Sequence, residues 1–221
     1  MAVLIEVGQI HGDAGVEDRV QLVAIRSTEI KLLLSILEIP SVRRQAKPID
    51  LRIYHWMGEN GFADEKTELL RGVIVEKISK SPLHEYIIGQ LLGVAQNAVK
   101  SDHLVRKEGP LTLVDSEPEP DIAIVCGSLA DFRLAHPGTA RLVIEVAISS
   151  VDVDREKAAI YAEADIPEYW LVIPEKNTME IHSSPKNGIF TQRRVLGVGE
   201  IAIAAEFPEL TVNLQTLFQG K

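Results

Sequence analysis

Residues 141–157 read RLVIEVAISSVDVDREK, a strand pattern followed by the start of a helix. Successive side chains of a strand point to opposite faces of the sheet, so the first half of this stretch presents two faces. One face would carry Leu142, Ile144 and Val146, and the other would carry Val143, Glu145 and Ala147. Glu145 is thus an acidic side chain in an otherwise apolar run. Burying such a carboxylate is costly unless another group neutralises its charge.

A second acidic residue opens an apolar strand farther upstream, in residues 118–125, which read PEPDIAIV. If this strand pairs with the strand that contains Glu145, the carboxylates of Asp121 and Glu145 converge at one point of the sheet. Carboxylate oxygens, without sulfur or paired histidine, suit a hard cation such as Mg²⁺ or Mn²⁺. The pair is therefore a candidate metal site.

The run DREKAAIYAEAD, residues 154–165, predicts a helix directly after the Glu145 strand. Asp154, Lys157 and Tyr161 are three and four residues apart, so they share one helix face. A lysine beside a metal-bound water could orient or activate that water, or stabilise charge on a phosphate oxygen. A divalent ion also lowers the pKa of the water it binds. This combination serves phosphodiester hydrolysis.

Each of these residues also has a purely structural interpretation. Asp121 fits a turn after a proline, and Lys157 fits an exposed helix charge. Asp154 begins the run DREK and fits a helix cap. Composition and spacing leave these alternatives open. The charge of Glu145 could likewise be neutralised by an arginine, either Arg141 or Arg155.

From Ile49 onward the pattern predicts an α/β (α+β) domain with one central mixed sheet flanked by few helices. Residues 49–62 predict a short helix, and residues 67–79 predict a hairpin that turns at Arg71-Gly72. Residues 81–101 predict the longest helix, with Ser81 as its cap and Pro82 at its first position. Further strands are expected at HLVRK (103–107), PLTLV (110–114), DIAIV (121–125), EYWLVI (168–173), MEIHS (179–183), IFTQRRV (189–195) and IAIAA (201–205).

Residues 1–45 differ from the rest of the chain and are interpreted as an N-terminal extension of unknown role. The basic piece SVRRQAK, residues 41–47, lies between two prolines and predicts a connection.

Composition narrows the class of protein. Hydrophobic residues make up 46% and charged residues 25% of the 221 residues, as in ordinary globular proteins. The net charge of −9 argues against a passive, non-specific nucleic-acid coat, which needs a basic surface.

The single cysteine, Cys126, excludes an intramolecular disulfide and a thiol-rich metal site. No apolar run has the length of a membrane span and the N-terminus lacks a signal-peptide pattern, so we expect a cytoplasmic protein without membrane contact.

Several spaced motifs, in their order along the chain, resemble the Uma-type family of restriction-endonuclease-like proteins, which is common in cyanobacteria. The resemblance runs from about Ile49 to about residue 205, and it implies the PD-(D/E)XK nuclease fold, a mixed sheet flanked by helices. Residues 46–221 would form this nuclease-like domain. The motifs that carry the resemblance are TELLRGVIVEKISKSPLHEYIIGQL, PEPDIAIV, LVIEVAISS and DREKAAIYAEADIPEYWLVI.

The resemblance also implies roles for single residues. Asp121 and Glu145 would be metal ligands and catalytic residues. The usual motif has a lysine two residues after the second acid, where this chain has Ala147, but Lys157 on the following helix matches the catalytic lysine of the Uma-type family. Two more matches are candidates for the same site: Glu68, otherwise a hairpin surface charge, and His84, otherwise a hydrogen-bonding residue at a helix end.

Our leading hypothesis is an endonuclease, dependent on Mg²⁺ or Mn²⁺, that hydrolyses phosphodiester bonds of DNA, and we expect a homodimer. A second hypothesis is a catalytically inactive nuclease-fold module that binds nucleic acid or protein, which the net charge of −9 and the N-terminal extension favour. A third is a metal-dependent hydrolase of smaller phosphoesters. Metal-dependent DNA cleavage that disappears in Asp121→Ala would select the first.

Overall fold

A computed structural model of the chain describes residues 3–5, 23–25, 35–64, 66–77 and 81–219. The chain divides into two compact units, residues 1–47 and residues 48–221. In the first unit, strand β1 (Val3–Ile5) pairs antiparallel with β2 (Val23–Ile25). A 3-10 turn, η1 (Ser35–Glu38), and a short helix, α2 (Pro40–Gln45), follow.

Helix α2 corrects one prediction. It covers most of the basic piece that was expected to be a plain connection. Pro40 stands in the first turn of the helix, where a missing backbone N–H costs no hydrogen bond and the fixed φ angle suits helical geometry. The proline therefore starts a helix here and does not interrupt one.

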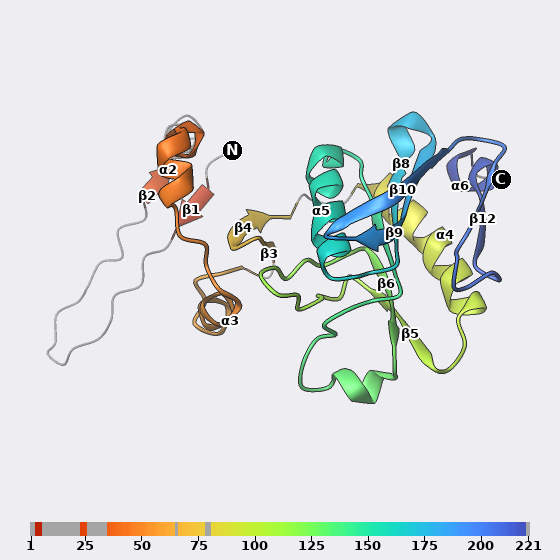
Figure 1. The fold of residues 1–221 in the computed structure, drawn as a ribbon, viewed down its shortest axis with the longest axis horizontal. Helices are drawn as coiled ribbons and strands as arrows, with labels where there is room; N and C mark the ends of the chain where they lie inside the picture. The colour runs from red at the N-terminus through yellow and green to blue at the C-terminus, as the bar shows by residue number, and fades with distance from the viewer. Residues whose placement is uncertain (1–2, 6–22, 26–34, 65, 78–80, 220–221) are drawn as a thin grey trace, which may run out of the picture. The chain divides into compact units, whose positions relative to one another are not determined.

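The second unit is built around a six-stranded sheet (Figure 1). The strand order is β10-β9-β8-β7-β6-β5, and only the β7–β8 pair is parallel. This mixed sheet with flanking helices confirms the predicted fold class. The strands are β5 (His103–Lys107), β6 (Ile122–Cys126), β7 (Leu142–Val146), β8 (Glu168–Ile173), β9 (Thr178–Lys186) and β10 (Ile189–Leu196).

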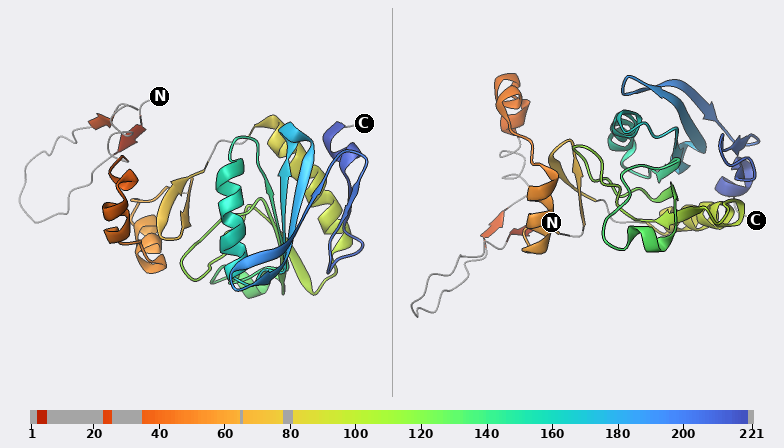
Figure 2. Two further views of the ribbon diagram at one scale, coloured as in Figure 1. Left: turned by 45° about the horizontal axis from the view of Figure 1, so that its top comes forward. Right: turned by 60° about the horizontal axis from the view of Figure 1, so that its bottom comes forward.

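Two long helices cover opposite faces of the sheet, α4 (Pro82–Ala98) on one and α5 (Val151–Glu163) on the other (Figure 2). Side chains of β7 alternate between the two hydrophobic cores, as the sequence predicts. The core below α4 and the C-terminal helix α6 (Leu214–Gln219) contains Leu142, Ile144 and Val146. The core below α5 contains Val143 and Ala147.

Two small hairpins complete the unit, β3 (Thr67–Leu70) with β4 (Val73–Glu76), and β11 (Ile201–Ile203) with β12 (Thr211–Asn213). The first turns at Arg71-Gly72, as predicted, and both residues have positive φ angles. The predicted helices at residues 49–62 and 81–101 are also present, as α3 (Leu51–Glu59) and α4. Ser81 caps α4 by accepting a hydrogen bond from the backbone of His84.

One predicted strand is wrong. Residues 110–114 lie in a loop in which Leu111 and Leu113 are buried. Their backbone N–H groups donate to the carbonyls of Pro118 and Ser116, because the loop turns back on itself. The alternation of apolar residues therefore reflects burial without strand pairing.

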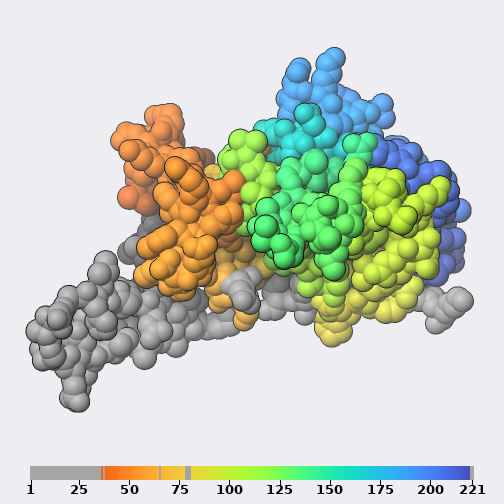
Figure 3. Space-filling model, turned by 90° about the horizontal axis from the view of Figure 1, so that it is seen from below, coloured from red at the N-terminus to blue at the C-terminus, as the bar shows by residue number. Residues whose placement is uncertain are grey.

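The remaining short elements are 3-10 turns. Turn η2 (Leu129–Phe132) lies in the β6–β7 loop at the surface of the second unit (green in Figure 3), and η3 (Pro174–Lys176) follows β8. Within the described residues, no helix is both long and apolar enough to cross a lipid bilayer.

Candidate active site

The pairing of β6 with β7 brings Asp121 and Glu145 together. Ile122 lies opposite Ile144 in this antiparallel pair, so the residue before β6 meets the residue near the end of β7. The backbone N–H of Asp121 donates to Glu145 Oε2 at 3.3 Å, and Asp121 Oδ2 accepts from the backbone N–H of Val146 at 2.7 Å. Both carboxylates are buried. The predicted convergence of the two acids is therefore present.

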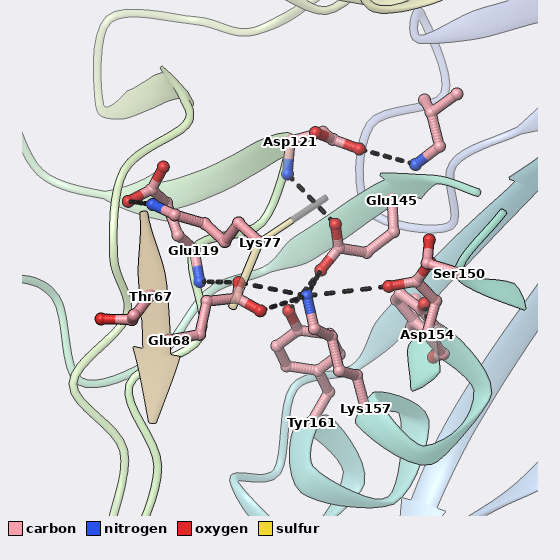
Figure 4. Close-up of polar contacts among 12 residues, drawn as sticks. Thr67, Glu68, Lys77, Glu119, Asp121, Glu145, Ser150, Asp154, Lys157 and Tyr161 are labelled. Carbon is pink, nitrogen blue, oxygen red and sulfur yellow. Dashed lines mark hydrogen bonds and ion pairs between the residues drawn. The ribbon is translucent and has the colours of Figure 1, made fainter. Parts of the chain in front are cut away.

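Lys157 extends from α5 into the same place (Figure 4). Its Nζ lies 2.9 Å from Glu68 Oε2, 3.1 Å from Glu145 Oε1 and 3.7 Å from Asp154 Oδ1. Tyr161, one turn farther along, donates its hydroxyl to Glu145 Oε1 at 2.8 Å. The predicted helix face is confirmed. Lys157 is only 5% exposed, so its interpretation as an exposed helix charge is wrong.

Asp154 does not cap the helix. Helix α5 begins at Val151, and its N-cap residue, Ser150, makes no capping hydrogen bond through its side chain. Asp154 instead accepts a hydrogen bond from the Ser150 hydroxyl and faces Lys157. The cap interpretation fails because the helix begins one turn before the run DREK.

Glu68 and His84 reach the site from outside the central sheet. Glu68, on β3, is buried, and its Oε1 accepts from the backbone N–H of Glu119 at 2.7 Å, so it is not a surface charge. His84, in the first turn of α4, has Nε2 3.2 Å from Asp121 Oδ2. Its other ring nitrogen, Nδ1, is buried without a hydrogen-bond partner in the described part of the chain.

These side chains share one pocket of about 250 Å³. All five residues predicted for the site contribute to its lining, together with Asp154 and with others that the sequence reasoning missed. Glu119 lies two residues before Asp121, so an extended backbone places both on the same side, a signal that the sequence does carry. Lys77 follows β4 and has no comparable signal. The predicted residues of the lining are Glu68, His84, Asp121, Glu145 and Lys157.

Burial and neighbouring charges shift the pKa values of the ionisable side chains in this pocket. Burial raises the pKa of Glu145 well above its usual value, and Asp121, Asp154 and Glu68 raise it further, against the attraction of Lys157. Burial also raises the pKa of Asp154. Although burial alone lowers the pKa of Lys157, its three carboxylate neighbours outweigh burial and raise that pKa, so the amine stays protonated.

The two arginines predicted as alternative partners of Glu145 form ion pairs with other carboxylates. Arg141 pairs with Glu206, and Arg155 pairs with Glu180 at 2.6 Å. Neutralisation of Glu145 by arginine is therefore wrong.

The pocket fits a divalent cation through its charge and its oxygen ligands. Three buried carboxylates, those of Glu68, Glu145 and Asp154, face the buried ammonium group of Lys157, and a fourth, that of Asp121, lies beside Glu145. Across the described residues, no three histidine, cysteine or acidic side chains form a ready-made ligand cage. Mg²⁺ needs no such cage, because it is usually held by one or two carboxylates, waters and substrate phosphates.

Comparisons with known proteins identify the family and the fold of the chain. A family described as "Putative restriction endonuclease" (Uma2) matches residues 54–215, which contain every residue of the pocket. The solved structure of a "putative nuclease" from Anabaena variabilis is similar, with a TM-score of 0.65 and 19% identity over 78% of this chain and 98% of that chain. At this identity the likeness establishes the fold. No curated protein matches. The chain belongs to the Uma2 family.

Proposed function

We propose that the protein is a metal-dependent endonuclease that hydrolyses phosphodiester bonds of DNA. The observation that carries the proposal is the excess of buried carboxylates around Lys157, in a pocket that opens to solvent. Uncompensated buried charge is costly, so such an excess favours a bound cation. Asp121 and Glu145 would hold Mg²⁺ or Mn²⁺, and membership of the Uma2 family supports nucleic acid as the substrate.

The residues around Asp121 and Glu145 then have separate roles. A bound divalent ion would supply a water of lowered pKa and offset phosphate charge. Lys157 is protonated, so it cannot act as a general base; its N–H groups would hold the surrounding carboxylates in place and orient the attacking water. Tyr161 holds Glu145 Oε1 through its hydroxyl, and His84 lies against Asp121 Oδ2.

The test is cleavage of plasmid and single-stranded DNA by the full chain in Mg²⁺, in Mn²⁺ and in chelator. We expect cleavage that needs metal and disappears in Asp121→Ala. The matched control is Asp152→Asn, which removes an exposed carboxylate from α5 that does not line the pocket. Metal-dependent cleavage of equal rate in Asp121→Ala would contradict the proposal. Cleavage of small phosphodiesters without cleavage of DNA would identify a hydrolase of smaller substrates.

One observation favours a second candidate, a nuclease-fold module that binds nucleic acid or protein without cutting. Lys157 lies between three carboxylates, where its ammonium already offsets part of their charge. Titration with Mn²⁺ separates the two candidates, because the inactive module predicts no binding that depends on Asp121 and Glu145. The homodimer stays a prediction, which light scattering of the full chain would test.

A further inference from the structure

The pocket contains a second ammonium group, and its situation differs from that of Lys157. Lys77 follows β4 and lines the pocket together with Glu68 and Asp121. Its side chain is 22% exposed, and among the described residues its one ion-pair partner is Glu119, with Nζ 2.8 Å from Oε2. A lysine ammonium has three N–H donors, so Lys77 retains donors for a ligand.

Lys157 is poorly placed to bind a substrate phosphate as well. It is 5% exposed and faces Glu68, Glu145 and Asp154 at once. Turning its ammonium toward a phosphate would leave buried carboxylates without their partner, which is strongly unfavourable. The cation that receives the substrate must therefore lie nearer the mouth of the pocket.

The Lys77–Glu119 pair is linked to the floor of the pocket. The backbone N–H of Lys77 donates to the carbonyl of Lys66 and thereby extends the β3–β4 pairing by one residue. The backbone N–H of Glu119 donates to Glu68 Oε1, and Glu68 in turn contacts Lys157 (Figure 4). The backbone of Lys77 is thus fixed at one side of the pocket, while its partly exposed ammonium can exchange Glu119 for another partner.

Lys77 and Glu119 also line a second hollow, of about 410 Å³, together with Tyr54 and Glu117. Lys77 therefore lies where two hollows adjoin. A chain of nucleotides bound over Lys77 could continue on both sides of it, whereas a mononucleotide would use one hollow only.

We propose that Lys77 binds a backbone phosphate of a polynucleotide substrate, and that Glu119 holds this lysine in position until the phosphate replaces it. The Lys77–Glu119 pair is partly exposed, with side-chain exposures of 22% and 23%, so water offsets part of the cost of opening it. A phosphate offers Lys77 charge-assisted hydrogen bonds in return. This inference rests on the proposed function and adds to it the residue that recognises the polymer.

The test compares Lys77→Met, Lys77→Arg and the wild type in binding a fluorescent single-stranded DNA, with Ca²⁺ in place of Mg²⁺, from about 50 to 200 mM salt. We expect Lys77→Met to weaken binding about fivefold to tenfold at low salt, and to reduce the slope of log K against log salt by about 1. Lys77→Arg retains the slope. Lys186→Met, which removes an exposed ammonium outside both hollows, is the control and behaves as the wild type.

Cleavage kinetics in Mg²⁺ complete the test. A phosphate-binding role predicts that Lys77→Met raises KM and leaves kcat within about twofold, because uniform binding is lost. An unchanged salt slope, or a fall in kcat at constant KM, would overturn the role of Lys77 while cleavage by the wild type persists. Binding that depends on Lys77 without any cleavage by the wild type would support Lys77 and overturn the nuclease. A wild type that neither binds nor cleaves would overturn both.

Discussion

Glu68 and Lys157 are 89 positions apart in the chain, yet Lys157 Nζ lies 2.9 Å from Glu68 Oε2 and both side chains are buried. The contact joins the β3–β4 hairpin to helix α5. Since Lys157 also contacts Glu145, the hairpin, the sheet and the helix meet at one ammonium group. The position of this lysine therefore depends on the hairpin as much as on its own helix.

This contact predicts strong coupling between the two residues. Lys157→Met leaves buried carboxylates without a cation and should cost about 3 kcal/mol of unfolding free energy and at least about 100-fold in kcat. Glu68→Gln should cost less, since Lys157 keeps Glu145 and Asp154. The double variant should be more stable than the sum of the single changes by about 1–3 kcal/mol. Urea unfolding followed by tryptophan fluorescence measures the cycle, and simple additivity would contradict it.

A comparison of Glu145→Gln with Glu168→Gln separates catalysis from stability. Both carboxylates are buried, but Glu168 lies outside the pocket and accepts hydrogen bonds from Trp170 Nε1 at 2.6 Å and from the backbone of Ala205 at 2.8 Å. Glu168→Gln places an amide N–H against one of these donors, so it should cost about 1–3 kcal/mol of stability and leave the activity of the folded protein intact.

Glu145→Gln should show the opposite pattern. Relief of repulsion from Asp121 offsets the lost hydrogen bonds, because the pKa of Glu145 is already raised by burial and by neighbouring acids. We expect a change in unfolding free energy below about 1 kcal/mol and a loss of cleavage of at least about 100-fold. Thermal unfolding and cleavage rates of both variants test this difference. Equal losses of stability in Glu145→Gln and Glu168→Gln would contradict it.

The parts of the site that the sequence predicts depend on local periodicity. The alternation of β7 places Glu145 opposite the apolar face, and helical spacing places Lys157 beside Tyr161, because both relationships involve neighbours within one element. The burial of Glu68 depends on contacts that no local pattern contains. Leu69 bridges to Glu117, and Glu68 binds the backbone of Glu119, both about 50 residues away.

Two predictions from local patterns are wrong, one for residues 110–114 and one for Asp154. Residues 110–114 alternate like a strand, but their hydrogen bonds go to residues within the loop and to Pro137. Asp is a residue type that often caps helices, but α5 begins at Val151, three residues before Asp154. In each case a tertiary contact or an earlier helix start overrides a local preference.

Gly72 offers a test of the hairpin as the support for Glu68 and Lys77. Its φ is +74°, and an added Cβ would lie 2.3 Å from the Cβ of Pro48. Gly72→Ala should therefore cost about 3 kcal/mol or more and lower cleavage by displacing the hairpin. Gly61 is the matched control, since its φ is +73° but no atom lies within 4 Å of its added Cβ.

Gly61→Ala should cost only the backbone strain, about 1 kcal/mol, with unchanged cleavage. Urea unfolding and DNA cleavage of the two variants provide the comparison. Equal losses of unfolding free energy in Gly72→Ala and Gly61→Ala would contradict the prediction. They would mean that the hairpin can move at its turn and so relieve the close approach to Pro48.

Acid should weaken the fold through Glu180. Burial by itself would raise the pKa of Glu180, but hydrogen bonds and charges from Arg155 and Arg193 outweigh burial and lower that pKa to about 2. A carboxyl whose pKa is lower in the folded state stabilises the fold above its unfolded pKa, and this contribution is lost as the pH falls through the folded value.

The free energy of unfolding of the wild type should therefore exceed that of Glu180→Gln by about 2 kcal/mol near neutral pH. The difference should shrink as the pH falls from about 5 to about 2. Urea unfolding of both proteins across this range measures the difference, and a difference that stays constant with pH would mean that the two arginines do not stabilise the ionised carboxylate.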